Sequence, residues 1–475
     1  MRAAELKSSP AESANWDKAL TELRSGLRGP VRVPGEPEYE AARRVFNGMI
    51  DRHPRLIVQP QGVADVIRAV EFARTRGVPL AVKGGGHNVA GNAICDDGVV
   101  LDLSRMRGVQ VDRVDRSAWV EAGATWADVD RETQVHGLAT PGGRVSSTGV
   151  AGFTLGGGIG WLSRQHGLAC DNLLAVDLVT ADGRALRASP VEHPDLFWGL
   201  RGGGGNFGVV TRFQFRLHPV GPAVYGGLLA FPGELGGEIL PALARYAASA
   251  PPQLSVVSVL ITAPPAPFIP KEFHGKHLVG IAALWNGPVA AGESVMRPIR
   301  TLGPAVVDHI GPMEYLQLQG MFDALNPSGL LNYWKSQYLE TLSPGAIAAV
   351  MDRWAEIPSP LSEIHFEFLG GGIGGVGEGE SAYSNRAATV LMNYVGKWTD
   401  PAETDANIRF IRGLWDATAP FSTRGTYVNF LADASPEIVR SAYGGDKFDR
   451  LAKLKATYDP NNFFRANANI PPAPK

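Results

Sequence analysis

Residues 201–217 read Arg-Gly-Gly-Gly-Gly-Asn-Phe-Gly-Val-Val-Thr-Arg-Phe-Gln-Phe-Arg-Leu. From Gly203 to Gly208 they match G-x-G-x-x-G, the pattern of a dinucleotide-binding loop that opens a helix. After Gly208, however, apolar and polar residues alternate, and a period of two is typical of a half-buried strand. The stretch therefore predicts a glycine loop that leads into a β-strand, and it disfavours a nicotinamide-binding Rossmann domain.

Two further glycine-rich loops lie upstream. Residues 83–88, Lys-Gly-Gly-Gly-His-Asn, follow a predicted strand and lead into no convincing helix, and residues 149–160 read GVAGFTLGGGIG. Glycines let the backbone approach a ligand closely and turn N–H groups onto an anion. One such loop is more often a tight turn between strands, but three loops within about 120 residues favour a large ligand that carries phosphate.

Composition excludes several classes of protein. The chain has 475 residues, a net charge of -2, 57 Gly, 35 Pro and 2 Cys. The length fits two domains better than one. The near-zero net charge shows no excess of positive charge that would bind nucleic acid or an anionic membrane. Two cysteines cannot form a disulfide framework. Gly-x-Ser-x-Gly is absent, which removes the simplest hydrolase interpretation.

Targeting and metal signals are weak. The first 20 residues lack the apolar core of a secretory signal, and no apolar run reaches the roughly 18 residues that span a bilayer. We therefore expect a cytoplasmic protein without a membrane segment. His274 and His277 have metal-like spacing, but no Cys or carboxylate stands at ligand spacing, so we expect a surface pair and no metal.

Periodicity predicts a mixed α/β arrangement in the first 220 residues or so. Segment 55–83 predicts strand, helix and strand, with Gly77 ending the helix. A second helix is expected from Thr125, with Asp128 as capping-box partner, to about Gly137. Segment 173–180 predicts a strand.

After Pro219 the pattern changes to that of a second domain. Strands are expected at 255–262, 277–285, 364–369 and 388–395, and helices at 236–249 and 344–355. We therefore divide the chain into an N-terminal domain (1–221), a middle α+β domain (222–424) and a C-terminal segment of short motifs (425–475).

Four motifs occur in a specific order: GGGHN (84–88), TPGGRVSSTGVAGFTLGGGIGWLSRQHGLACDNL (140–173), FWGLRGGGGNFGVVTRFQF (197–215) and DPNNFFRANANIPP (459–472). Together they resemble the berberine bridge enzyme-like FAD-linked oxidases of the vanillyl-alcohol oxidase/p-cresol methylhydroxylase (PCMH) superfamily. The chain is similar in particular to the bacterial branch that contains 6-hydroxy-D-nicotine oxidase and the enterocin-pathway flavin oxygenase.

The resemblance implies an α+β fold. A two-lobed FAD-binding domain of the vanillyl-alcohol oxidase/PCMH type would form from both ends of the chain, and an α+β substrate domain with an antiparallel sheet would roof the flavin. It also implies that His87 bonds covalently to the 8α carbon of FAD. Plant-type members carry a second tether, a Cys, where Val145 stands here. Cys95 and Cys170 are not placed to replace it, so we expect one covalent link and ordinary buried thiols.

The resemblance also assigns further cofactor contacts. Near the pyrophosphate it places Gly84, Gly85, Gly86 and Asn88; beside the ribityl chain and ring, Thr148, Gly149, Gly152, Gly157 and Gly160; near adenine, Val210; and near the pyrimidine edge, Asn467 and Asn469. Thr148 matches the gatekeeper at the oxygen-reactive face of the flavin. Asn467 and Asn469 have the alternative role of backbone capping.

The sequence offers two candidates for the catalytic base. The family often uses the second Tyr of a Y-x-N-Y motif, but residues 427–430 are Tyr-Val-Asn-Phe, and Phe430 cannot ionise. Tyr427 is one candidate, although an ordinary tyrosine pKa of about 10 requires activation near neutrality, and a packed aromatic is equally compatible.

Glu367 is the other candidate base. Alternation places Glu367 and His365 on one strand face, opposite Phe366 and Phe368. On the inner face of a roofing sheet, burial would raise the pKa of this carboxyl group; on a solvated face both are surface groups. Trp161, Trp334 and Tyr338 are candidate aromatic walls of a substrate pocket, or core residues.

Three functions follow from these expectations. The first is an oxidase that transfers hydride from a small alcohol, amine, alkaloid, sugar or secondary metabolite to covalent FAD, with oxygen reduced to hydrogen peroxide. The second is a monooxygenase of the same fold acting through a flavin-N5-oxide. The third is a flavin-carrying binding protein without turnover. The expected partners are a small substrate and oxygen, on a monomer or homodimer.

Overall fold

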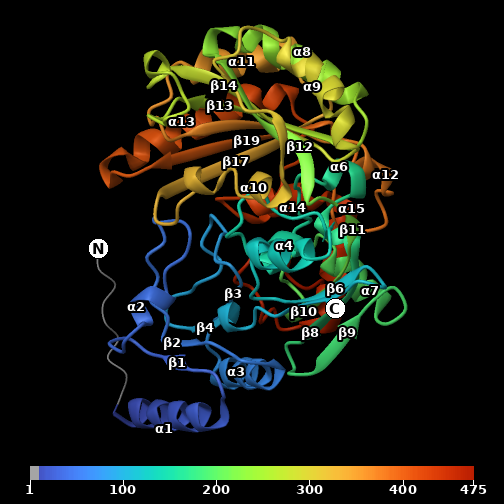
Figure 1. Ribbon diagram of the computed structural model, residues 1–475. Coiled ribbons are helices and arrows are strands. Elements are labelled where there is room, and N and C mark those ends of the chain that lie inside the picture. The colour runs from blue at the N-terminus through green and yellow to red at the C-terminus, as the bar shows by residue number, and fades with distance from the viewer. Residues whose placement is uncertain (1–9, 475) are drawn as a thin grey trace.

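The computed structural model describes residues 10–474, and the chain forms two halves (Figure 1). The upper half in that view is one large sheet with helices on its outer face. The lower half contains three smaller sheets and both ends of the chain. The two halves meet at the inner face of the large sheet.

The first sheet of the lower half has the order β1-β2-β4-β3. Its strands are β1 (Val31–Arg32), β2 (Leu56–Val58), β4 (Val99–Asp102) and β3 (Leu80–Lys83), and β4 is parallel to β2 and β3. Helix α3 (Val63–Arg76) connects β2 to β3 and ends at Gly77, whose φ of 64° suits glycine. The predicted strand, helix and strand are thereby confirmed. Helix α1 (Pro10–Gly26) contacts α3.

The second sheet is antiparallel, with the order β5-β6-β10-β8-β9. Its strands are β5 (Val109–Asp112), β6 (Ser117–Glu121), β10 (Val209–Arg216), β8 (Leu173–Val179) and β9 (Ala185–Ala188). Strand β10 is central, which confirms the strand predicted after Gly208. A small ladder pairs β7 (Leu138–Ala139) with β11 (His218–Pro219).

Helix α4 (Trp126–Gln134) begins as predicted, because Thr125 and Asp128 form a capping box. The other helices of the lower half are short: α2 (Tyr39–Ala42), α5 (Val150–Leu155), α6 (Ser163–His166) and α7 (Pro194–Leu200). Helix α5 starts within the second glycine loop, and α7 ends just before the third.

The large sheet has the order β15-β12-β14-β13-β18-β19-β17, with β16 also paired to β12. All its pairings are antiparallel. The strands are β12 (Ala223–Pro232), β13 (Leu254–Thr262), β14 (His277–Trp285), β15 (Val307–Asp308), β16 (Gly311–Glu314), β17 (Leu331–Leu339), β18 (Glu363–Phe368) and β19 (Val390–Trp398). The four strands predicted here are confirmed, and β19 runs three residues beyond the predicted end at 395.

Helices cover the outer face of this sheet (Figure 1). They are α8 (Gly236–Ser249), α9 (Gly292–Arg300), α11 (Pro344–Trp354) and α13 (Thr404–Thr418). The alternation along β18 sends Ile364, Phe366 and Phe368 into the core beneath these helices. The opposite face of β18 therefore points toward the lower half. Two short helices, α10 (Tyr315–Gln319) and α12 (Gly372–Gly375), lie elsewhere in this part of the chain.

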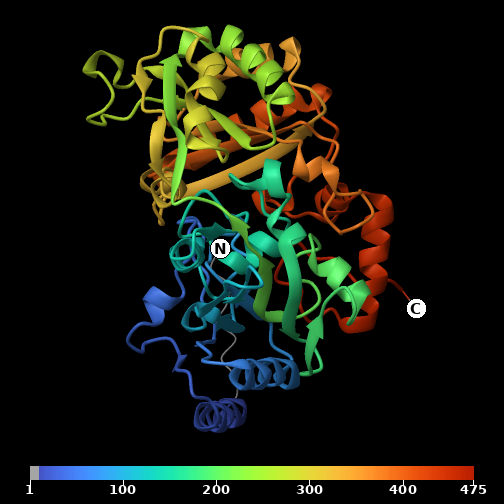
Figure 2. The same cartoon turned by 45° about the vertical axis from the view of Figure 1, so that its right-hand side comes forward.

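The C-terminal helices α14 (Pro436–Tyr443) and α15 (Gly445–Tyr458) return to the lower half, as Figure 2 shows in red. The fully buried Lys455 of α15 forms an ion pair of 2.7 Å with Asp459 and donates to the backbone oxygen of Asn206 in the third glycine loop. We keep the division at 221/222 and 424/425 as a proposal, since every strand of the large sheet falls between these boundaries.

Among residues 10–474, no helix is both long and apolar enough to cross a membrane. Within the same residues, no group of three or more His, Cys, Asp or Glu side chains is arranged to hold a metal ion. The His274 imidazole contacts the backbone oxygen of Ile269, and the His277 ring stacks on Trp354. Cys95 and Cys170 are both buried and free.

Candidate functional site

The glycine loops, the inner face of the large sheet and the C-terminal segment line one cavity. The first two loops contribute Gly84, Gly85, Gly86, His87, Asn88, Thr148, Gly149 and Gly152, and the third contributes Gly204, Gly205 and Gly208, followed by Val210. The sheet contributes Val257, Trp334, Glu363, His365, Glu367, Asn393 and Val395, and the C-terminal segment Val428, Asn429, Phe430 and Asn467. Most of the predicted site residues therefore line the same cavity.

The glycines of these loops have two different kinds of surroundings. A Cβ atom on Gly85 would overlap the backbone nitrogen of Gly149, so the first two loops can touch only as glycines. At Gly152 and Gly205, which line the cavity, a Cβ atom would meet nothing within 4 Å. These two glycines therefore leave open space over the floor of the cavity, which forms a cradle for a bulky ligand.

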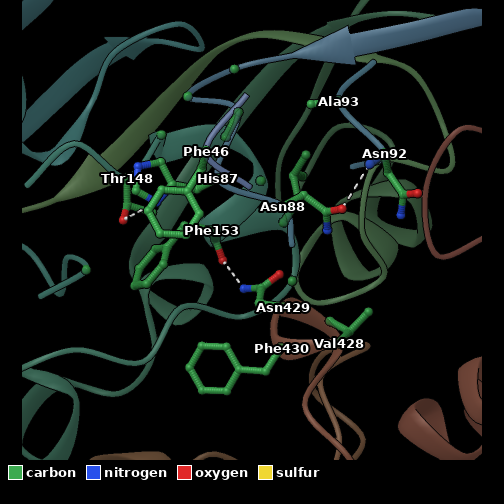
Figure 3. A pocket seen from close by; sticks show the side chains of 18 of the residues that line it. Phe46, His87, Asn88, Asn92, Ala93, Thr148, Phe153, Val428, Asn429 and Phe430 are labelled. Atoms are coloured by element: carbon green, nitrogen blue, oxygen red, sulfur yellow. Dashed lines mark hydrogen bonds between the residues drawn. The ribbon is translucent and has the colours of Figure 1, made fainter. Parts of the chain in front are cut away.

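His87 lies in the cavity wall beneath Phe46 (Figure 3). The two rings stack with centroids 4.4 Å apart and an interplanar angle of 18°. The Nε2 atom lies 3.0 Å from the Ser147 Oγ atom, and Nδ1 lies 3.5 Å from the Thr148 Oγ1 atom. Burial lowers the pKa of His87 to about 4, although the negative charge of Asp323 opposes this shift. The imidazole is therefore neutral at pH 7 and keeps a free lone pair.

A three-residue charge network lies in the roof. The carboxylate of Glu363 is 2.8 Å from the Lys397 Nζ atom and 2.9 Å from the His365 Nε2 atom. Burial acts to raise the pKa of Glu363, but the charge of Lys397 and the hydrogen bond with His365 outweigh it and lower this pKa to about 2. Glu363 is therefore an anion that fixes the orientation of His365.

Glu367 follows on the same face of β18. Its carboxylate lies 2.6 Å from the Arg144 Nη1 atom, and the Arg144 guanidinium lies over the Trp161 ring at 4.8 Å. Nearby, the buried Oδ1 atom of Asn393 has no hydrogen-bond partner in the described structure. The roof thus presents a paired carboxylate, an imidazole and an unpaired amide oxygen to the cavity.

The walls between floor and roof are aromatic. Trp334 makes edge contacts with Phe46 and Phe430, at centroid distances of 6.0 and 5.9 Å. Phe430 comes from the C-terminal segment and lies across the cavity from His87 in Figure 3. An apolar enclosure of this kind excludes water and strengthens the electrostatic interactions inside it.

Tyr427 does not line this cavity. Its hydroxyl oxygen accepts hydrogen bonds of 2.9 Å from the Gly158 backbone N–H and from the Asn429 Nδ2 atom. Burial raises its pKa well above the ordinary value. The side chain therefore holds the second glycine loop against the C-terminal segment, and it is poorly suited to accept a substrate proton.

Five other predicted residues also lie outside the cavity lining: Tyr338, Trp161, Gly157, Gly160 and Asn469. Tyr338 is buried and bonds through its hydroxyl to Tyr383 at 2.7 Å. Trp161 lies in a separate core beneath Arg144. Gly157 and Gly160 pack against Tyr383 and the Gly142 backbone, respectively, rather than the cavity. Tyr338, Trp161, Gly157 and Gly160 therefore pack around the site without lining it.

Known proteins match the chain along nearly its whole length. A family model described as FAD binding domain matches residues 54–189, and one described as berberine and berberine like matches residues 426–471. A FAD-linked oxidoreductase of Dictyostelium discoideum is 32% identical, with 95% of this chain and 97% of the relative covered. The chain belongs to the FAD-linked oxidoreductases of the berberine bridge enzyme-like family.

Two further relatives agree with this assignment. An (R)-6-hydroxynicotine oxidase of Paenarthrobacter nicotinovorans is 28% identical, with 94% and 97% of the two chains covered. The crystal structure of 6-hydroxy-D-nicotine oxidase from Arthrobacter nicotinovorans superposes with a TM-score of 0.84 at 26% identity, covering 94% of this chain and 98% of that one. The predicted α+β fold and the enzyme class, a FAD-linked oxidoreductase, are confirmed.

The residues present fit FAD as the ligand. Gly152 and Gly205 leave open space over the cavity floor, and the buried Oδ1 atom of Asn467 has no partner in the described part of the chain. The three loops supply close backbone approach of the kind that a pyrophosphate requires. The same cavity continues to the polar roof, so a ligand on the loops would face Glu367 and His365.

Sequence reasoning missed several residues of this site. Ser147 and Phe46, which contact His87, and Arg144, Glu363, Lys397 and Asn393 were not predicted. The alternation along β18 already places Glu363 on the face of His365 and Glu367, so extending that pattern by one step would have found it. The others depend on contacts between distant segments.

Proposed function

We propose that this protein is an oxidase that holds FAD through one covalent bond to His87 and oxidises a small alcohol or amine. The supporting observation is that His87 and Glu367 line the same cavity from opposite halves of the chain. When bound, FAD accepts a hydride from a substrate carbon and passes the two electrons to oxygen, which leaves as hydrogen peroxide.

The chain would hold FAD with residues from all three loops. A neutral imidazole with a free lone pair at His87 supports the covalent role. Gly84, Gly85, Gly86 and Asn88 would contact the pyrophosphate; Thr148, Gly149 and Gly152 the ribityl chain and ring; Val210 the adenine; and Asn467 the pyrimidine edge. Val145, rather than a cysteine, lines the cavity near Thr148, which supports a single link.

Glu367 is the proposed base for the O–H or N–H proton of the substrate. It lines the cavity, and its ion pair with Arg144 fixes the position of the carboxylate. Tyr427 is not retained as the base, because its oxygen accepts two N–H groups outside the cavity lining. His365, oriented by Glu363, would bind a polar group of the substrate beside Glu367.

The walls favour a substrate with an apolar ring. Phe46, Trp334 and Phe430 offer ring faces and edges between the loops and the sheet, next to the polar groups of Glu367 and His365. A relative is named for oxidation of 6-hydroxynicotine, a compound with a heteroaromatic ring and an amine. A hydroxylated aromatic amine or alcohol therefore suits this cavity better than an oligosaccharide, which needs many hydrogen-bonding groups along its length.

An anaerobic screen tests this proposal. The purified holoprotein is mixed without oxygen with 6-hydroxynicotine, benzylic alcohols, aromatic amines, glucose and xylobiose, and its visible absorbance is recorded. We expect an aromatic amine or alcohol to bleach the flavin, and oxygen then to restore the colour with one peroxide per substrate oxidised. Failure of all these compounds to bleach the flavin would favour a binding protein without turnover.

The same reaction separates an oxidase from a monooxygenase. Turnover is run under isotopically labelled oxygen, and both product and peroxide are analysed. An oxidase leaves the label in peroxide alone. Label in the organic product, with little peroxide, would show instead that the enzyme inserts oxygen.

A further inference from the structure

The contacts of His87 differ on the two sides of its ring. Nε2 has a hydrogen-bond partner at 3.0 Å, the Ser147 Oγ atom, whereas Nδ1 has only Thr148 at 3.5 Å, the outer limit for a hydrogen bond. Ser147 is exposed and does not line the cavity, while His87 does. Ser147 therefore contacts the imidazole from its solvent side.

A neutral imidazole carries its proton on one nitrogen and a lone pair on the other, and the hydrogen bond of one nitrogen selects the tautomer. A proton on Nε2 can be donated to the Ser147 oxygen at 3.0 Å. The lone pair then lies on Nδ1, which has no short competing hydrogen bond. Phe46 stacks on the ring at 4.4 Å and limits its rotation out of this orientation.

We infer that Ser147 is a positioning residue for flavin attachment: its hydroxyl holds the His87 proton on Nε2, leaves Nδ1 as the nitrogen that bonds, and then passes the proton to solvent. This inference rests on the proposed covalent role of His87. A hydroxyl group suits both stages, because it accepts from Nε2–H before the bond forms and donates to the bare Nε2 atom afterwards.

The attachment balances with oxygen as oxidant. The new bond joins Nδ1 to the 8α carbon of the flavin, and the imidazole loses its Nε2 hydrogen while the methyl carbon loses one hydrogen. The two protons and two electrons leave as one molecule of hydrogen peroxide once oxygen accepts them. The Ser147 hydroxyl accepts and passes on only the Nε2 proton. Removing this hydroxyl therefore slows attachment, but the bonding nitrogen of His87 remains.

The test measures attachment directly. Apoprotein from riboflavin-limited cells is mixed with FAD in air, samples are denatured in acid at intervals, and intact mass reports the fraction that has gained one flavin. We expect Ser147→Ala to slow attachment about tenfold, as the loss of one orienting hydrogen bond implies. Ser147→Thr keeps a hydroxyl and is expected to attach at close to the wild-type rate.

Two controls separate this effect from damage to the loop. Ser146→Ala removes the neighbouring hydroxyl, which bonds to Asp323 rather than to His87, and the Ser146 backbone N–H keeps its own bond to Asp323. We expect this variant to attach flavin at the wild-type rate. The visible spectrum of each native protein before denaturation reports whether FAD still binds in the folded site.

The outcomes test the role of Ser147 separately from the proposed covalent role of His87. Wild-type attachment in Ser147→Ala, equal slowing in Ser146→Ala, or equal slowing in Ser147→Thr would each overturn the role of Ser147. Acid-stable flavin in His87→Ala, or none in the wild-type protein, would overturn the covalent role of His87, and the role of Ser147 with it.

Discussion

Glu367 is the residue on which substrate oxidation is proposed to depend. Replacement by Gln keeps the size of the side chain and removes its ability to accept a proton. With a substrate found in the anaerobic screen, we expect Glu367→Gln to lower the rate of flavin reduction by about 10²- to 10⁴-fold, the usual contribution of a positioned base. Stopped-flow absorbance at saturating substrate measures this rate.

His365→Asn is the matched comparison on the same strand face. It removes the imidazole but leaves the Glu367–Arg144 pair in place. We expect mainly weaker substrate binding and a smaller effect on flavin reduction. A larger loss of reduction rate in His365→Asn than in Glu367→Gln would assign the base to His365 and contradict our choice.

For individual residues, the sequence predicted which side chains line the cavity better than it predicted the partners that those side chains contact. The motif around His87 and the alternation of His365 with Glu367 were visible in the chain and place these residues in the cavity. The ion pair of Glu363 with Lys397 was not visible, because it forms only when β18 and β19 pair side by side. Likewise, no local pattern reveals that the Tyr427 hydroxyl is occupied by Gly158, which lies far away in sequence.

Among the structural elements, the glycine loops are expected to respond in opposite ways to a Gly→Ala substitution: it lowers stability at one position and raises it at another. Gly85→Ala places a Cβ atom on the backbone of Gly149, and overpacking of this kind costs about 1–3 kcal/mol. Gly152 lies inside helix α5 with open space around it, so Gly152→Ala is expected to stabilise the apoprotein by about 0.5–1 kcal/mol. Thermal melts of the two apoproteins measure this contrast.

Flavin content gives the second half of that prediction. The added methyl group of Gly152→Ala projects into space that FAD is proposed to fill, so this stable variant is expected to bind less flavin than the wild-type protein. Full flavin content in Gly152→Ala would show that FAD does not approach this glycine. A wild-type melting temperature in Gly85→Ala would show that the first two loops are further apart than described.

Whole elements were predicted more fully than the site. Helices 236–249 and 344–355 appear as α8 and α11 within one residue, because their apolar positions recur at helical spacing. Strand β10 was distinguished from a helix by its period of two. Sheet order was not predictable, since β18 pairs with β13 over a separation of about 100 residues, and local periodicity carries no information on such partners.

For the whole molecule, the C-terminal segment depends on a buried ion pair. Lys455 and Asp459 are fully buried, and Lys455 also donates to Asn206 and Phe464. Lys455→Met leaves the Asp459 charge unpaired, and breaking a buried pair in this way costs about 3–5 kcal/mol. Urea unfolding measures the loss. Arg440→Met, which breaks the exposed pair with Asp449, is the control and is expected to leave the midpoint nearly unchanged.

Acid sensitivity of the fold is predicted from two stacked histidines. The rings of His166 and His218 lie 3.7 Å apart, and burial lowers the pKa of each to about 4. The unfolded chain binds protons at these groups below about pH 6.5, whereas the folded chain does so only near pH 4. Their contribution to stability is therefore complete above pH 6.5 and declines as the pH falls toward 4.

Melting temperatures at pH 7 and pH 5 measure this decline. We expect the His166→Gln/His218→Gln double variant to lose less stability between the two values than the wild-type protein. An equal loss in both proteins would show that other groups set the acid sensitivity.

The covalent bond at His87 is the central claim, and peptide mapping tests it most directly. The purified wild-type protein is denatured in acid, digested with trypsin and analysed by tandem mass spectrometry, with flavin absorbance followed during separation. We predict one yellow peptide, with the flavin mass on His87. A flavin mass on another residue, or digested protein in which every peptide is free of flavin, would contradict the account.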